Sequence, residues 1–355
     1  MTFEDVLEIK NGKNQRAVEN PNGKYPIYGS GGIMGYADNY ICNANTVIIG
    51  RKGNINKPIF VDEPFWNVDT AFGLEAKKEL LLPRYLYYFC LRYDFERLNK
   101  AVTIPSLTKA DLLKIDIDIP KIDIQTTIVD RLGKIEQIIS LRNNQLRLLE
   151  NLIKARFVEL LGDPRQNPNG YEVHELSEYI EFLTSGSRGW AKYCVDDGKE
   201  WFITIKNVKD CKIATDNMQP VNAPDNAEAK RTRVQEGDLL ISITADLGRT
   251  GVITKEIADH GAYINQHLTL IRLNQEYLEP LYVAYFMEST AGKEQFISKN
   301  QSAVKAGLNF NSINTLKLLV PPKDIQQEFL SFVAQVDKSK SRKKLNHKTE
   351  NRLAS

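Results

Sequence analysis

The most regular pattern of apolar residues lies at the centre of the chain. Between residues 128 and 160, large apolar side chains recur at alternating intervals of four and three, at Ile128, Leu132, Ile135, Ile139, Leu146, Leu149, Ile153 and Leu160. This heptad spacing is typical of a helix that buries one stripe against another helix. Arg142 and Arg156 occupy the two remaining positions of the stripe, and Gly162 and Pro164 provide stop signals. The pattern predicts a spacer helix in the segment 125–163.

A second pattern occurs twice. Leu113–Gln125 reads LKIDIDIPKIDIQ, and Leu316–Gln326 reads LKLLVPPKDIQ. In each copy an apolar run typical of a strand ends at proline, and Asp-Ile-Gln then begins a helix. Upstream, both halves order strand-like runs, a glycine-containing loop, further strand-like runs and a helix with aromatic residues on one face. Asn67–Thr70 and Ile264–His267 take the same relative place in this order. The repeat predicts one α+β module used twice.

The two copies divide the chain. We expect a first domain over 1–124, the coiled-coil-like spacer helix over 125–163, a second domain over 164–324, and a second helix with a basic tail over 325–355. The second helix opens with Phe329, Val333 and Val336 at helical spacing, but beyond Val336 only Leu345 and Leu353 are large and apolar. We therefore expect this helix to be a shortened copy of the first.

Composition narrows the class of protein. A net charge of +2 over 355 residues does not by itself indicate a nucleic-acid binder, and the basic segment 338–352 is typical of a solvated tail. No apolar run reaches the roughly 18–20 residues that cross a bilayer, and the N-terminus is acidic and amphipathic. The four cysteines are scattered without metal-binding spacing. We expect a cytoplasmic protein with reduced thiols and no membrane partner.

Catalytic and cofactor motifs do not stand out in the sequence. No glycine-rich phosphate loop follows a strand, and the four histidines have no metal-ligand spacing. The one Pro-Pro pair, Pro321-Pro322, lacks the flanking residues of an adenine methyltransferase motif. His267, in a strand-like run, is more typical of a core or groove residue than of a catalyst. We expect no catalytic residue, no metal site and no cofactor on this chain.

The order of the motifs resembles the specificity (S) subunit of type I restriction-modification systems. The resemblance rests on the two strand–Pro–Asp-Ile-Gln joints and on further motifs in the same order, namely Tyr25–Gly32, Leu161–Pro164 followed by Asn167–Tyr171, Glu236–Ser242 and Asp337–Lys340. It implies that each module is a target recognition domain that reads one half of a split DNA sequence. It also implies that the helices set the spacing and dock methyltransferase subunits.

The resemblance further implies the partners. These are double-stranded DNA, two copies of the methyltransferase (M) subunit, and restriction (R) subunits that join through the complex in defence against foreign DNA. S-adenosylmethionine, ATP and magnesium are expected on those partner subunits. The residues expected in the helix seam and in partner docking are Gln125, Ile128, Leu132, Ile135, Ile139, Leu146, Leu149, Ile153, Gln326, Phe329, Val333 and Val336.

Base edges are read by Arg, Lys, Asn and Gln side chains presented on a rigid scaffold, and phosphates supply most of the affinity. Candidate DNA-contacting residues are Lys13, Arg16, Arg51, Lys52 and Asn54 in the first domain, and Arg188, Trp190, Lys192, Lys206, Lys230, Arg231, Arg233, Arg249 and Lys305 in the second. Each basic residue taken alone is more typical of an ordinary solvated charge, so clusters carry more weight than single members.

Three other interpretations stay open on the sequence alone. The chain could be an adaptor with two interaction modules on a coiled-coil spacer. It could be an enzyme with recognition modules, which would need catalytic motifs. It could also be an inactive, truncated specificity subunit, because the family's second helix runs as long as the first, whereas here the apolar repeat stops after Val336.

Overall fold

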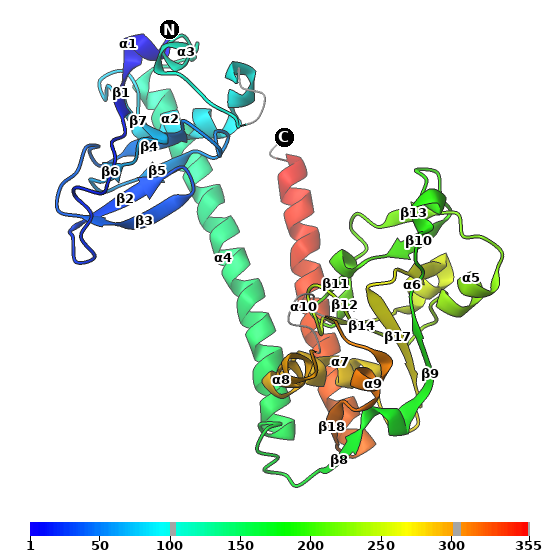
Figure 1. The fold of residues 1–355 in the computed structure, drawn as a ribbon. Coiled ribbons are helices and arrows are strands. Elements are labelled where there is room, and N and C mark those ends of the chain that lie inside the picture. The colour runs from blue at the N-terminus through cyan, green and yellow to red at the C-terminus, as the bar shows by residue number, and fades with distance from the viewer. Residues whose placement is uncertain (100–103, 301–306, 354–355) are drawn as a thin grey trace. The chain divides into compact units, whose positions relative to one another are not determined.

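The computed structural model describes residues 1–99, 104–300 and 307–353. It divides into two compact units, Met1–Asn143 and Asn144–Ser355. Each unit has its own buried core, and each is described here by itself (Figure 1).

The first unit is built on two small sheets. A four-stranded antiparallel sheet has the order β1-β7-β4-β5, and a three-stranded sheet has the order β3-β2-β6, in which β2 pairs antiparallel with β3 and parallel with β6. The strands are β1 (Leu7–Asn11), β2 (Tyr25–Gly29), β3 (Gly32–Ala37), β4 (Thr46–Gly50), β5 (Ile59–Val61), β6 (Trp66–Asn67) and β7 (Ala71–Ala76). The helices are α1 (Phe3–Val6), α2 (Pro83–Arg92), η1 (Phe95–Leu98), α3 (Lys109–Leu113) and the first part of α4 (Ile122–Leu161).

The burial of these strands follows their sequences. β4 reads TVIIG and is buried at every position, which is typical of a strand covered on both faces. β1 alternates, with Leu7 and Ile9 buried and Glu8 exposed. The aromatic helix α2 packs on β4, β5 and β7 and starts with Pro83, a residue favoured in the first turn.

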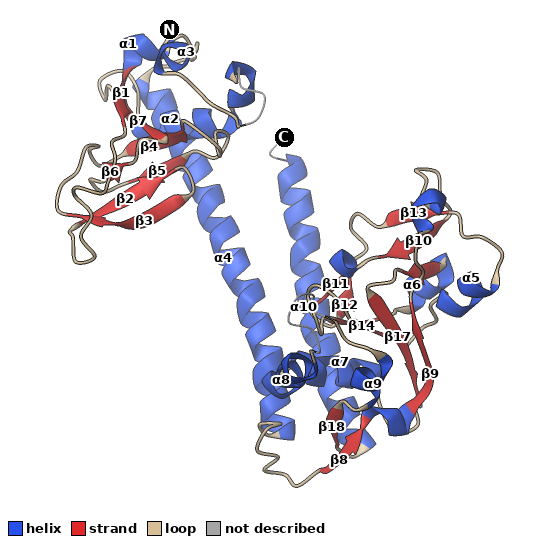
Figure 2. Ribbon diagram, viewed as in Figure 1, coloured by secondary structure: helices blue, strands red, loops and turns tan. Residues whose placement is uncertain are grey.

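The second unit repeats this arrangement. Its four-stranded antiparallel sheet has the order β9-β17-β14-β15, and its three-stranded sheet has the order β13-β10-β16, again with one antiparallel and one parallel pairing (Figure 2). Two strand pairs are added, β11-β12 and β18-β8. The strands are β8 (Glu172–Glu175), β9 (Ile180–Ser185), β10 (Glu200–Ile203), β11 (Val208–Lys209), β12 (Lys212–Ile213), β13 (Gln219–Val221), β14 (Leu239–Ser242), β15 (Thr250–Val252), β16 (Ala262–Ile264), β17 (Leu268–Leu273) and β18 (Lys317–Val320).

The helices of the second unit follow the same plan. The aromatic helix α7 packs on β14 and β15, as α2 packs on the first sheet. The helices are η2 (Leu176–Tyr179), η3 (Trp190–Tyr193), η4 (Ile205–Asn207), α5 (Ala227–Thr232), α6 (Lys255–His260), α7 (Pro280–Glu288), α8 (Thr290–Lys299), α9 (Phe310–Asn314) and α10 (Lys323–Leu353). The matching sheet orders confirm the prediction of an α+β module used twice.

A glutamine is buried at the start of the long helix in each unit. In the first unit, Gln125 is 0% exposed. Its Oε1 accepts a hydrogen bond from the Leu82 backbone N–H at 2.8 Å, where Leu82 is the N-cap of α2. Its Nε2 donates to the carbonyls of Leu80 and Pro120, both at 2.8 Å. One amide therefore joins the N-cap of α2, the turn just before it and the segment that leads into α4.

Gln326 makes the same three contacts in the second unit. It is also 0% exposed, and its Oε1 accepts from the backbone N–H of Glu279, the N-cap of α7, at 2.9 Å. Its Nε2 donates to the carbonyls of Tyr277 at 3.0 Å and Pro321 at 2.9 Å. The sequence repeat is therefore a repeat of hydrogen bonds.

A tyrosine adds a fourth matching bond to each joint. The Tyr85 hydroxyl on α2 donates to the Asp118 carbonyl at 3.1 Å, and the Tyr282 hydroxyl on α7 donates to the Leu319 carbonyl at 2.9 Å. Both carbonyls lie seven residues before the buried glutamine. Leu319 belongs to β18, whereas Asp118 belongs to a segment that forms only an isolated bridge, at Asp116, so the strand predicted before Pro120 is not formed in the first unit.

The long helices differ in length. α4 has 40 residues and begins at Ile122, and α10 has 31 residues, which confirms the prediction of a shorter second helix. Within the second unit the two helices pack antiparallel, because Glu150 lies 3.9 Å from Lys340 whereas Arg156 contacts Glu328 at 2.6 Å. Phe157 meets Phe329 edge-on, with ring centroids 5.3 Å apart.

We expect the Gln326→Leu substitution to lower the free energy of unfolding of the second unit by about 2–4 kcal/mol. It would leave the Glu279 N–H and two carbonyls without their partner, and each unsatisfied buried group costs roughly 1–3 kcal/mol. The measurement is chemical denaturation of the full chain. Gln327→Leu, at the exposed neighbouring position, is the matched control and should change stability by less than about 0.5 kcal/mol. Equal effects of the two substitutions would contradict the structural role of the buried amide.

Candidate nucleic-acid interface

Three loops of the first domain meet at one end of the four-stranded sheet. The loops are residues 12–16 after β1, residues 51–54 after β4 and residues 68–70 before β7. We call the surface that they form the first three-loop edge. The Lys13 N–H donates to the Asn67 carbonyl at 2.9 Å, and the Arg51 N–H donates to the Thr70 carbonyl at 2.8 Å. These bonds hold the loops together because β7 lies between β1 and β4 in the sheet, with Asn11 opposite Phe72 and Gly50 opposite Ala71.

The second domain has the same surface, the second three-loop edge, formed by 186–190, 243–249 and 265–267. The Ser187 N–H donates to the Ile264 carbonyl at 2.8 Å, and the Ile243 N–H donates to the His267 carbonyl at 3.0 Å. These bonds match those of Lys13 and Arg51, so the two edges correspond position by position.

A glycine fixes the first loop of each edge. A Cβ atom at Gly12 would lie 1.7 Å from the Val68 carbonyl oxygen, and one at Gly186 would lie 2.0 Å from the Asn265 carbonyl oxygen. Both contacts are with backbone, which has no freedom to move aside, so only glycine permits this approach. The loops are therefore held rigidly where they leave the sheet.

The first three-loop edge gathers the candidates of its domain. Lys13, Arg16, Arg51, Lys52 and Asn54 are all exposed. The Lys52 carbonyl accepts a hydrogen bond from the Ser30 hydroxyl at 3.4 Å, which places the β2–β3 turn beside them. The arrangement presents cationic and amide groups along one edge, as contacts to a polyanion require.

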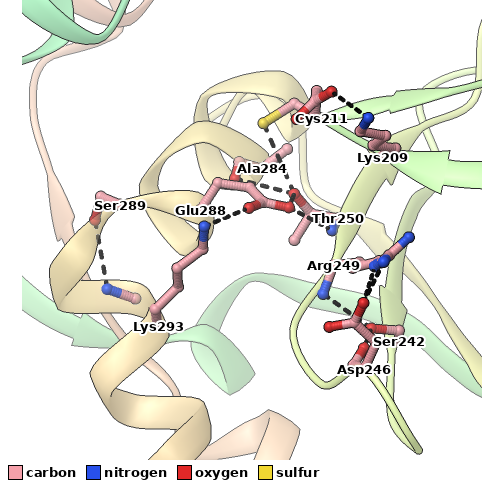
Figure 3. A network of polar contacts seen from close by, with 12 residues as sticks. Lys209, Cys211, Ser242, Asp246, Arg249, Thr250, Ala284, Glu288, Ser289 and Lys293 are labelled. Carbon is pink, nitrogen blue, oxygen red and sulfur yellow. Dashed lines mark hydrogen bonds and ion pairs between the residues drawn. The ribbon is translucent and has the colours of Figure 1, made fainter. Parts of the chain in front are cut away.

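The second three-loop edge holds two of the sequence candidates. Arg188 is exposed, and its Nε donates to the Gln266 Oε1 at 2.8 Å. Arg249 lies in the turn between β14 and β15, where its guanidinium forms an ion pair with Asp246, as Figure 3 shows. The Ser242 hydroxyl donates to the Asp246 carbonyl and accepts from the Arg249 N–H, so the turn is braced from inside.

The base of this turn is tied to the aromatic helix. The Glu288 carboxylate at the end of α7 accepts from the Thr250 N–H at 3.0 Å and pairs with Lys293 at 3.1 Å (Figure 3). The Thr250 hydroxyl donates to the Ala284 carbonyl at 3.1 Å. The position of the Arg249 turn is thus set by the helix that also carries the joint.

Other candidates of the second domain are already engaged within the fold. Lys230 pairs with Asp225 at 3.4 Å, and Arg233 lies 3.4 Å from both Glu200 and the Tyr263 hydroxyl. Arg231 on α5 donates to the Ser185 carbonyl at 2.7 Å and to the Thr184 hydroxyl, which brings it to the end of β9. Arg231 therefore lies next to the second three-loop edge.

Trp190 is a core residue, so the prediction that it contacts DNA is wrong. It was predicted as a DNA-contacting residue, but it is 3% exposed and stacks on Phe202 with ring centroids 5.7 Å apart. Its indole Nε1 donates to Glu228 at 2.9 Å. The burial of a large aromatic side chain with a satisfied N–H is the arrangement of a core residue.

The remaining candidates are placed as follows. Lys192 is exposed, with its ammonium 4.9 Å from the Tyr193 ring centroid, and Lys206 is exposed in η4. Lys305 lies outside the described residues. Three residues on the second three-loop edge were not among the predicted DNA-contacting residues: Thr244, Gln266 and His267. The repeat offered a signal, because Ile264–His267 aligns with Asn67–Thr70.

The predicted seam and docking residues fall into three groups. Gln125 and Gln326 are buried in the joints, which corrects their assignment to a docking surface. Ile153, Phe329, Val333 and Val336 are buried in the core of the second unit, and Ile128, Leu132, Leu146 and Leu149 are half-buried. Ile135 and Ile139 are 40% and 39% exposed, beside the exposed Ile138 and Leu141.

The cysteines and the acidic and histidine side chains are the groups from which a thiol or metal site would be built. The four cysteines are free thiols, and burial raises the pKa of Cys42 to about 12. Over residues 1–99, 104–300 and 307–353, no cluster of His, Cys, Asp and Glu side chains has the arrangement of a metal site. No described helix is long and apolar enough to cross a membrane.

Known proteins share both the sequence pattern and the fold. The chain matches the family model of the type I restriction modification DNA specificity domain over residues 1–151 and 197–351. It is 19% identical over 343 residues to the type I restriction enzyme EcoBI specificity subunit of Escherichia coli, spanning 88% of this chain and 70% of that protein. It spans 62% of a Haemophilus influenzae relative and 40% of a Methanocaldococcus jannaschii relative, at 24% and 25% identity.

Solved structures show the same fold. The crystal structure of a type I restriction-modification S subunit from M. genitalium matches with a TM-score of 0.62 and 15% identity, over 99% of this chain and 92% of that chain. A chain from a structure of type I restriction-modification complex assembly matches with a TM-score of 0.55 and 16% identity, over 100% and 94%. By its family model and by the repeated fold, the chain belongs to the family of type I restriction-modification DNA specificity domains.

Proposed function

We propose that this chain is the DNA-reading subunit of a type I restriction-modification complex. Each domain reads one half of a split site through its three-loop edge, and α4 sets the distance between the half-sites. The duplication carries this proposal. Two domains with the same sheet orders and the same joint hydrogen bonds present different side chains at corresponding loop positions. That is what two unequal half-sites require.

The chain itself supplies recognition and no chemistry in this proposal. Methyl transfer and cleavage, with S-adenosylmethionine, ATP and magnesium, belong to two methyltransferase subunits and to restriction subunits that join through the complex. Membership in the specificity-domain family supports this division.

The exposed apolar surface of α4 supports docking of partner subunits. Ile138 and Leu141 are 47% and 67% exposed, and Leu148 and Leu152 are 53% and 48% exposed. Groups of large apolar side chains left open on a helix are typical of a protein interaction surface. Burying them against methyltransferase helices would remove this surface from water.

We expect the chain, purified together with its methyltransferase partner, to direct adenine methylation to one split, asymmetric DNA sequence. The measurement is sequencing of methylated bases on plasmid DNA treated with the complex. The methyltransferase without this chain is the control and should produce no such motif. Methylation without a split motif would contradict the proposal.

We expect a seven-residue helical insertion between Asn143 and Asn144 to lengthen the spacer of the DNA site by about three base pairs. Seven residues add roughly 10.5 Å to a helix, and B-DNA rises about 3.4 Å per base pair. Mapping of methylated sites would show the new spacing with both half-sites unchanged. The control is a seven-residue insertion in the turn 167–170, which lengthens the chain but not the helix. An unchanged spacing in the first variant would refute the role of α4 as a spacer, and a changed half-site would refute the division into two independent reading domains.

A further inference from the structure

The second three-loop edge carries a chain of side-chain hydrogen bonds that crosses all three loops. The Arg188 Nε donates to the Gln266 Oε1 at 2.8 Å. The Gln266 Nε2 lies 3.4 Å from the His267 Nε2, and the His267 Nδ1 lies 2.6 Å from the Thr244 Oγ1. Four residues from three separate loops are thus linked in one line.

The hydrogen bond from Arg188 fixes which atoms of Gln266 accept and which donate. Because the Gln266 oxygen accepts the hydrogen bond that the Arg188 Nε–H donates, the amide nitrogen faces His267 and donates to it. With the amide in this orientation, the His267 Nε2 is placed to accept from Gln266, and the His267 Nδ1 faces the Thr244 hydroxyl. The orientation of the Gln266 amide is therefore fixed from both sides.

The loop that carries Arg188 is anchored on the same turn. Gly186 packs on the Asn265 backbone, and the Gln266 N–H donates to the Ser187 carbonyl at 3.0 Å. The buried Ser187 hydroxyl lies 3.0 Å from the Thr232 hydroxyl. Arg188 therefore extends from a rigid base, as precise recognition of a ligand requires.

The hydrogen bond with Gln266 leaves the two terminal nitrogens of Arg188 without an intramolecular partner among the described residues. Gln266 holds the Nε and is neutral, whereas Arg233 and Arg249 are paired with carboxylates. Within the part of the chain that the structure describes, the two terminal nitrogens of the exposed Arg188 have no hydrogen-bond partner. The guanidinium keeps its charge and two parallel donors facing solvent.

Two parallel donors in a fixed plane match the O6 and N7 acceptors of guanine in the major groove. Contacts with phosphates position the protein on the duplex but carry no sequence information, and a point charge such as lysine can also make them. A glutamine amide that holds the guanidinium plane through its Nε therefore favours recognition of a base. We propose that Arg188 reads a guanine in the half-site bound by the second domain, with Gln266 as its positioning residue. This inference rests on the proposed function and assigns one base contact within it.

The first domain does not repeat this arrangement. Its positions that correspond to Arg188 and Gln266 are Asn14 and Asp69, because Lys13 corresponds to Ser187 and Val68 to Asn265 in the backbone bonds. The Asn14 Oδ1 accepts from the Arg16 N–H at 2.9 Å. The arginine held by a glutamine amide is therefore particular to the second domain.

The test measures binding of the complete complex, with its methyltransferase subunits, to duplexes carrying every single base-pair change in the mapped site. We expect a preference for guanine at one position of one half-site. Arg188→Ala should reduce that preference by about 5- to 150-fold, the range for loss of a bidentate base contact, and leave the other positions unchanged. Arg188→Lys should also lose most of it, because lysine lacks the planar fork.

Gln266→Met keeps the volume of the side chain and removes the acceptor, so it should weaken the preference at the same position. Lys192→Ala, at an exposed position of the neighbouring η3, is the matched control and should leave the preference intact. Thermal unfolding of each variant distinguishes a loss of folding from a loss of the guanine preference.

Three results would overturn the inference while the proposed function stands. They are a wild-type site without guanine specificity in either half-site, an Arg188→Ala loss that is equal for all sequences, and a change that affects both half-sites. A wild-type complex that recognises no split site would instead refute the proposed function itself.

Discussion

Gln125 and Gln326 each join three segments of backbone through one buried amide. The amide satisfies the N-cap N–H of the aromatic helix, a carbonyl two residues before that N-cap, and the carbonyl of the proline five residues before the glutamine. No hydrophobic side chain of similar size could make these bonds, and unpaired backbone groups in a buried joint are costly. The aromatic helix covers the sheet, and the sheet positions the loops. The orientation of each recognition surface therefore depends on this amide.

The sequence was sufficient to predict the joints because all the signals they need are local. The apolar run, the proline and the helix start lie within thirteen residues, and the heptad stripe of α4 is read directly from its spacing. Arg156, which interrupts that stripe, is also explained by the structure, because Glu328 on α10 neutralises it at 2.6 Å. The sequence could show the interruption, but the compensating acid lies 172 residues away.

The loop surfaces were harder to predict because their members are distant in sequence. Trp190 follows a run of small and polar residues, so it resembled a loop residue open to solvent. Its packing partners Phe202 and Tyr263 come from two later strands, and only their pairing in the sheet shows that the indole is enclosed. Gln266 and His267 were overlooked for a similar reason. Neither is an arginine or lysine, and their position beside Arg188 follows from the close approach of Gly186 to the Asn265 backbone.

Gly12 and Gly186 bear on how these domains can change over time. Each fixes the path of a loop through backbone contacts alone, and the side chains of Lys13 and Asn14 after Gly12 and of Arg188 after Gly186 are exposed. Substitutions at the outward positions can therefore accumulate at small folding cost, whereas a substitution at the glycine displaces the whole loop. The scaffold is tolerant at the outward loop positions and intolerant at the glycine beside them. If these loops read DNA as proposed, a lineage carrying this fold can acquire new targets while the stability of the domain remains nearly constant.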